Sequence, residues 1–169
     1  MGTAINLLIN GSLALLGVLL GHFVTKHTHI FQRSYERKSD LVIDLYKEVI
    51  RLEFVLKKYV HFTGAETDQD SIQEKIDELN NIKMDFQNFQ HKFWEVEIIL
   101  EDSTIEKINK FLQMYILITS KLSVANISQQ LRDNGQQFDK WNESFNAVSG
   151  DLVKIKEDLK KEFKCVLKK

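Results

Sequence analysis

The stretch that decides the fold is residues 71–96, SIQEKIDELNNIKMDFQNFQHKFWEV. Its apolar residues recur every three or four positions, which is the spacing of one face of an α-helix. Its first four residues, Ser71-Ile72-Gln73-Glu74, match a capping box, in which side chains bond the first free N–H groups of a helix. The stretch therefore predicts a long amphipathic helix. Its apolar face comprises Ile72, Ile76, Leu79, Ile82, Phe86, Phe89, Phe93 and Val96.

Three further segments with helical periodicity flank this stretch. The first covers about residues 32–61 and is followed by a polar loop at residues 63–70. A second capping box, Ser103-Thr104-Ile105-Glu106, predicts the start of the third helix, and Asn134-Gly135 predicts its left-handed end. The last segment follows from about residue 138, and Gly150 is a candidate bend within it.

The apolar positions of these segments are expected to form one core. In the first they are Leu41, Leu45, Ile50, Leu52, Val55 and Tyr59, with Val42 and Val49 less regular. In the third they are Ile105, Ile108, Leu112, Tyr115, Ile118, Leu122 and Ile127. In the last they are Phe138, Trp141, Phe145, Val148, Leu152, Ile155, Leu159, Phe163 and Val166.

Composition supports an all-helical chain. The 169 residues include no proline and only seven glycines, four of which lie in the first 21 residues. A sheet-rich domain needs more turn-forming residues than remain. We therefore expect an all-α fold, in which a membrane anchor over residues 1–25 precedes an up-down four-helix bundle over residues 26–169.

The anchor is predicted from residues 3–25, TAINLLINGSLALLGVLLGHFVT, which contain no charged residue. About 20 helical residues cross the hydrocarbon layer of a bilayer. A cleavable signal peptide is the alternative, but it would have a basic start, a shorter apolar core and a small-residue cleavage site. We therefore expect a single retained transmembrane helix.

One side of this predicted helix is polar or small. Asn6, Asn10, Leu13, Gly17 and Gly21 fall on one stripe of a helical wheel. Asparagine amides in hydrocarbon need partners across a helix interface or in water, and a small-xxx-small pair lets helices approach closely. This stripe predicts self-association or a pore lining. Hydration of the two asparagines among the outer headgroups is the alternative.

The flanks of the anchor predict its orientation. No basic residue precedes it, whereas Lys26 and Arg33 follow it closely, so the C-terminal domain is expected on the cytoplasmic side. His22, His27 and His29 are expected at the membrane boundary with them. The predicted location is thus the bacterial inner membrane, with the N-terminus outside.

No catalytic or metal-binding motif is visible. The sequence has no paired cysteines, no His-Glu-x-x-His and no phosphate-binding loop, and its net charge of −1 is not that of a DNA-binding protein. We expect no cofactor and no metal, and we expect the lone Cys165 to be exposed. The lysine-rich C-terminus is expected to be a solvated helix face, with anionic lipid or RNA as alternative contacts.

The arrangement of one N-terminal span followed by a helical domain resembles the membrane-anchored, HEPN-like accessory proteins of CRISPR type VI systems. The resemblance rests on this arrangement over the whole chain, and it implies homo-oligomers that permeabilise the inner membrane in antiviral defence. The ribonuclease signature of HEPN proteins, an Arg or Asn shortly before a His, is not matched. Nine residues separate Arg51 from His61, and two separate Asn88 from His91.

The sequence is therefore compatible with three functions. The first is a non-enzymatic, homo-oligomeric membrane protein that forms a pore. The second is a membrane-tethered adaptor that recruits a cytoplasmic protein, including an RNA-guided effector. The third is a degenerate HEPN-type ribonuclease.

Overall fold

A computed structural model describes the backbone of residues 2–62 and 69–167, and side chains from residue 21 on apart from those at 24, 27–31, 33, 34, 69–71 and 134. The described backbone is helical nearly throughout and contains no strand, so the all-α prediction is confirmed. The helices are α1 (Gly2–Phe62), α2 (Gln69–Val96), η1 (Glu97–Ile99), α3 (Asp102–Gln130), α4 (Asn134–Asn146), η2 (Ala147–Leu152) and α5 (Val153–Val166).

The chain divides into two compact units, Met1–Asp40 and Leu41–Lys169. The first unit consists of the N-terminal part of α1, and the second contains the remainder of α1 and all the other helices. The predicted boundary at residue 25 lies inside the first unit and stays a prediction. Among the side chains that are described, no helical stretch has the length and apolarity that crossing a bilayer requires.

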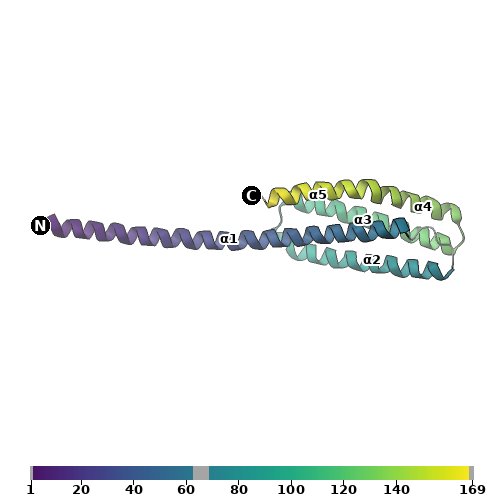
Figure 1. Cartoon of the computed structure of the whole chain (residues 1–169), viewed down its shortest axis with the longest axis horizontal. Coiled ribbons are helices and arrows are strands. Elements are labelled where there is room, and N and C mark those ends of the chain that lie inside the picture. The colour runs from purple at the N-terminus through teal and green to yellow at the C-terminus, as the bar shows by residue number, and fades with distance from the viewer. Residues whose placement is uncertain (1, 63–68, 168–169) are drawn as a thin grey trace. The chain divides into compact units, whose positions relative to one another are not determined.

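The second unit is a helical bundle in which successive long helices run in opposite directions (Figure 1). At one end, Tyr59 near the end of α1 contacts Lys75 near the start of α2 and Asn126 near the end of α3. At the other end, Tyr46 of α1 packs edge-on against Phe163 of α5, with ring centroids 5.7 Å apart. The segment α4–η2–α5 forms the fourth long helix of the bundle.

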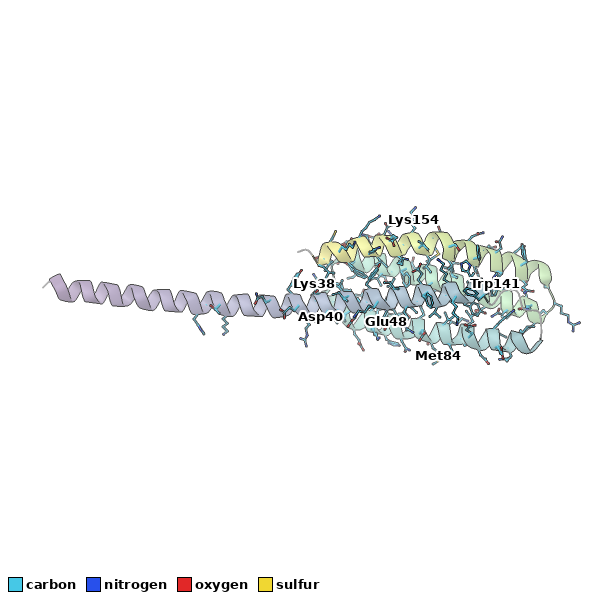
Figure 2. All side chains as sticks on the ribbon, in the orientation of Figure 1. Lys38, Asp40, Glu48, Met84, Trp141 and Lys154 are labelled. Atoms are coloured by element: carbon cyan, nitrogen blue, oxygen red, sulfur yellow. The ribbon has the colours of Figure 1, made fainter. Side chains whose placement is uncertain are left out.

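The core of this bundle follows the predicted stripes, with two deviations. In α2, Leu79, Ile82, Phe86, Phe89 and Phe93 are all buried, as predicted. In Figure 2, side chains fill the space between the helices. The buried aliphatic and aromatic residues come from every long helix, so the core runs the length of the bundle.

The first deviation is a small rotation of α1. Val42 and Val49 are fully buried, whereas Ile50, predicted to be core, is exposed. Leu45, Leu52 and Tyr59 of the predicted stripe are buried, and Leu56, which was not predicted, joins them, so the buried face of α1 is turned slightly away from Ile50. The second deviation is in the last two stripes, where Ile127, Phe138 and Phe145 are exposed rather than buried.

The predicted end of α3 is wrong by two residues. Arg132 adopts the left-handed backbone conformation, with φ of 61°, and the N–H of Asp133 donates to the carbonyl of Ser128 at 2.9 Å. This six-to-one bond is the one that closes a helix in a Schellman motif. Asn134 and Gly135 instead form the first turn of α4, whose N-cap Asp133 accepts from the N–H of Gln136 at 3.1 Å.

The predicted capping box of α3 is also wrong. The N-cap is Glu101, and its side chain makes no capping bond. Ser103 lies in the first turn and donates its hydroxyl proton to Glu162 of α5. A tertiary partner has therefore taken the serine that would otherwise cap the helix. The predicted bend at Gly150 coincides with η2, a π-helical turn that holds one more residue than an α-turn.

Candidate interaction surface

The predicted anchor stripe cannot be traced through side chains. Those of Asn6, Asn10, Leu13 and Gly17 lie outside the described residues, and so do those of His27, His29 and Arg33. His22 and Lys26 are exposed. Gly21 lies in open space, and its carbonyl accepts a 2.7 Å bond from the hydroxyl of Thr25. Of the predicted residues, only these three have described side chains, and the stripe and the membrane boundary stay predictions of the sequence.

The histidines considered for RNA cleavage lie in separate aromatic contacts. His61 of α1 packs against Phe145, with ring centroids 4.7 Å apart, and His91 of α2 packs against Trp94 at 5.5 Å. Among the described residues, no three His, Cys, Asp or Glu side chains gather into a metal site. Cys165 is exposed, as predicted.

A buried polar cluster fixes the position of α3 in the bundle. The hydroxyl of Tyr59 donates to the carbonyl of Lys75 at 3.1 Å and accepts from the amide of Asn126 at 2.9 Å. Burial raises the pKa of Tyr59 to about 12, so its hydroxyl stays protonated at neutral pH. Trp141 adds a bond from its indole N–H to the carbonyl of Val60 at 3.2 Å. Tyr59 of α1 thereby links Lys75 of α2 with Asn126 of α3, while Trp141 ties α4 to the end of α1.

Ion pairs on the bundle surface hold neighbouring helices together. Glu48 of α1 pairs with Lys92 of α2 at 2.7 Å, and Arg51 of α1 pairs with Asp85 of α2 at 2.8 Å. Hydrogen bonding to Lys92 lowers the pKa of Glu48. On the other side, Glu143 of α4 pairs with Lys121 of α3 at 2.9 Å and with Lys140 of α4 at 2.8 Å. Hydrogen bonds from Lys121 and then Lys140 lower the pKa of Glu143 to about 2.

The outward face of α3 differs from those of the other bundle helices because it is apolar. Five aliphatic side chains on this face are between 38% and 75% exposed. They are Ile116, Leu117, Val124, Ile127 and Leu131. Together they expose on the order of 500 Å² of apolar surface, which is near the upper limit for the largest patch on an ordinary monomer. We call these five residues and the exposed Gln113 and Ser120 the α3 outer face.

No charged residue lies on the α3 outer face. Between Lys110 and Arg132 the only charge is Lys121, which lies to one side and is paired with Glu143. The opposite side of α3 is core, with Phe111, Tyr115 and Leu122 among its buried residues. A helix that is apolar on both sides is usually covered on both sides. The α3 outer face therefore has the composition of a surface that another molecule covers.

On the other helices that the structure describes, the exposed apolar residues are more dispersed. On α1, Ile50 and Phe54 alternate with the lysines at positions 47, 57 and 58. On α2, the exposed Met84 lies among asparagines and glutamines, and the short η1 exposes the adjacent Ile98 and Ile99. Phe145 of α4 is exposed and packs against His61. Single exposed apolar residues are normal on protein surfaces.

A groove between α2 and α3 runs beside the α3 outer face. It encloses about 280 Å³ and shares Ile127 with that face. Its other lining residues are Ile76, Leu79, Asn80, Lys83, Ser123, Asn126 and Gln130. The groove carries both polar and apolar side chains, and its polar residues form a polar border to the apolar outer face.

Sequence reasoning placed Ile127 in the core and did not single out the rest of the α3 outer face. The available signal was the long uncharged interval between Lys110 and Lys121 and again between Lys121 and Arg132. A helix with one solvated side would carry more charges over that length. Exposure of the aliphatic residues in the folded bundle was needed to show that they face outward.

Comparison with known proteins adds no relative. No protein-family model matches the chain, and no curated protein or solved structure matches it either. The chain is thus an all-helical protein, and the most distinctive feature of its described part is the apolar α3 outer face.

Proposed function

We propose that this protein is a membrane-anchored, self-assembling helical protein that permeabilises the bacterial inner membrane and is not an enzyme. The observation that carries the proposal is the α3 outer face, since an uncharged aliphatic surface of this size is suited to binding another protein surface. The helical bundle supplies this surface on a rigid support.

The membrane anchor is inferred from the sequence. Residues 3–25 contain no charge, and Lys26 and Arg33 follow them. This pattern favours a single span with the bundle in the cytoplasm. Copies held in one bilayer are confined to two dimensions and one orientation, which raises their effective concentration and strengthens weak contacts between bundles.

Permeabilisation is inferred from the polar side of the predicted anchor helix. Asn6 and Asn10 recur with Gly17 and Gly21 on one stripe of the predicted helix. When several anchors associate through this stripe, glycines allow close approach and amides line the contact or the space between the helices. The bundles then hold the assembly together on the cytoplasmic side.

The test combines assembly with leakage. The purified full chain is expected to resist extraction from membranes by carbonate, to form oligomers in mild detergent and to release a trapped dye from liposomes. The double variant Asn6→Leu, Asn10→Leu is expected to lose most of the leakage. The matched control is Asn81→Leu, Asn88→Leu, which changes two exposed asparagines of α2 and is expected to leak like the wild type.

Liposomes as tight as empty ones would refute the pore, and a monomer that carbonate removes from membranes would refute the whole proposal. The ribonuclease alternative predicts RNA cleavage that His61→Ala or His91→Ala abolishes, which the same preparation can measure.

The α3 outer face also favours a second candidate, a membrane-tethered adaptor that recruits a different cytoplasmic protein, such as an RNA-guided effector. An apolar face with a polar border suits such a partner as well. Replacing residues 1–25 by an unrelated membrane helix separates the two functions. An adaptor keeps its activity after this exchange, whereas a pore-forming protein loses it.

A further inference from the structure

All residues of the α3 outer face except Ile116 follow the spacing of a coiled-coil seam. Successive steps of four and three residues connect the six positions, and every one of them is exposed. The positions are Gln113, Leu117, Ser120, Val124, Ile127 and Leu131. A seam of alternating four- and three-residue steps is the pattern through which two helices pack knobs into holes. The seam ends on its N-terminal side at the exposed ion pair between Glu106 and Lys110.

We propose that the α3 outer face packs against the same face of a second copy of this chain, as a parallel, in-register pair of α3 helices. The inference rests on the proposed function, because it names the surface through which membrane-anchored copies assemble. In this arrangement each seam residue meets its own counterpart, so that Leu117 contacts Leu117 and Val124 contacts Val124 of the other copy.

Charge and size favour a second copy as the occupant. A face that meets itself in register places every charge beside a like charge, and the seam from Gln113 to Leu131 contains none. Its exposed aliphatic surface, on the order of 500 Å², is more than half of the roughly 800 Å² that each partner buries in a standard interface. Ser123 and Gln130, which border the seam, add polar surface to it.

The centre of the seam allows the two helices to come close. Ser120 is a small residue midway between Leu117 and Val124, so the helices meet there without a bulky contact. The bundle core already holds α3 in helical form, through Phe111, Tyr115 and Leu122 among others. Pairing therefore needs no ordering of the backbone, and a short seam is sufficient.

The parallel direction follows from anchoring in one bilayer. Copies that insert residues 3–25 in one bilayer enter their bundles from the same side of that bilayer. A parallel pair of α3 helices, with its two-fold axis along the helices, keeps Leu41 of both copies at the same end of the paired bundles, whereas an antiparallel pair places the two at opposite ends.

Cysteine crosslinking in the full chain distinguishes these arrangements. The native exposed cysteine is first removed by Cys165→Ser. In this background, Gln113→Cys places one thiol at the N-terminal end of the seam. A parallel pair brings the two thiols within disulfide range, whereas an antiparallel pair places residue 113 opposite residue 131 and far from its own counterpart.

Mild oxidation in membranes is expected to convert most of the Gln113→Cys chain to a covalent dimer. The control Met84→Cys, an exposed position on α2, is expected to crosslink at least tenfold less. Adding Val124→Lys to the Gln113→Cys chain is expected to lower its crosslinking by about tenfold, because the lysines meet at the centre of the seam. Adding Ile98→Lys, which introduces the same charge at an exposed isoleucine of η1, is expected to leave it unchanged.

Two results would overturn the inference. One is equal crosslinking of Gln113→Cys and Met84→Cys. The other is a dimer that forms only when Gln113→Cys and Leu131→Cys chains are mixed, which would indicate antiparallel pairing. If the uncrosslinked chain is an oligomer in detergent, the first result means that the copies assemble through another surface. The second means that they assemble through the α3 outer face but not in the parallel direction. A monomer in detergent would instead refute the proposed function.

Discussion

Replacing Tyr59 by phenylalanine removes one oxygen atom from the bundle, and this oxygen makes two hydrogen bonds. The hydroxyl donates to the Lys75 carbonyl at 3.1 Å and accepts from the Asn126 amide at 2.9 Å. Tyr59 is fully buried and Asn126 nearly so. The carbonyl oxygen of Asn126 has no hydrogen-bond partner within the described part of the chain, so Tyr59→Phe leaves its amide nitrogen unpaired as well.

The expected cost is a sum of two effects. A buried hydrogen bond contributes about 1 kcal/mol net, and an orphaned buried donor costs a further 1–3 kcal/mol or so. We therefore expect Tyr59→Phe to lower the free energy of unfolding by about 2–4 kcal/mol. Tyr115→Phe is the matched control, because its hydroxyl makes only the 3.3 Å bond to the Leu52 carbonyl among the bonds described. Its expected cost is about 1 kcal/mol or less.

A second variant tests the mechanism. In Tyr59→Phe, Asn126→Leu the stranded amide is replaced by an apolar side chain of similar shape. Removing both partners of a buried hydrogen bond is much less costly than removing one. The double variant is therefore expected to be more stable than Tyr59→Phe alone, although it carries more substitutions.

Urea unfolding of the full chain in mild detergent measures these differences. Trp141 is a local reporter, because its ring lies 5.7 Å from that of Tyr59. Trp94→Phe removes the other tryptophan, which is exposed. The single variant Asn126→Leu is measured as well. If the stability lost by the double variant equals the sum of the losses of Tyr59→Phe and Asn126→Leu, then Tyr59 and Asn126 are not coupled in the way the structure indicates. Equal losses for Tyr59→Phe and Tyr115→Phe would refute the argument about the orphaned amide.

Three further predictions concern the same bundle. Arg132→Gly is expected to raise the free energy of unfolding by about 1 kcal/mol, measured by urea unfolding, because a non-glycine residue in the left-handed region is strained; a loss of stability would contradict this. Lys156→Met leaves the buried carboxylate of Glu53, which lies 2.9 Å from the lysine nitrogen, without its ion-pair partner. It is expected to lower the free energy of unfolding by about 3 kcal/mol in the same assay, and adding Glu53→Leu is expected to restore part of this loss. Lysine partners lower the pKa of Glu48 and Glu162 in the folded chain, so the unfolded chain binds protons more readily at acidic pH. The free energy of unfolding is therefore expected to be constant above about pH 5 and to fall as the pH drops toward the lowered pKa values of the two carboxyls. The double variant Glu48→Gln, Glu162→Gln should flatten this decline in urea unfolding measured from about pH 7 to about pH 3.

The helices and most of the core could be predicted because apolar periodicity records which side of a helix is buried. Phe86, Phe89 and Phe93 illustrate this, since all three are buried as their spacing indicates. Local capping signals were less informative. Ser103 bonds Glu162, which is 59 residues away, and a partner at that distance is invisible to a four-residue motif. Arg132 ends α3 in a conformation that sequence preference assigns to the following Asn or Gly.

The α3 outer face could not be predicted because periodicity fails on a helix that is apolar on two sides. Ile127 and Leu122 look alike in sequence, yet one is exposed and the other buried. Only the packing of the neighbouring helices decides between them. The stripe of Asn6, Asn10, Leu13, Gly17 and Gly21 stays a prediction of the sequence, and the liposome experiment is its test.

The π-helical turn η2 has a consequence for which mutations the last helix can accept. Each residue of an α-helix turns the chain by about 100°. Deleting Ser149 or Gly150 would remove the extra residue of this turn and rotate everything after it by that amount. Leu159 and Phe163, both buried, would then swing away from their neighbours. Substitution at these two exposed positions is harmless by comparison, so changes in chain length at this turn are far more damaging than changes in chemistry.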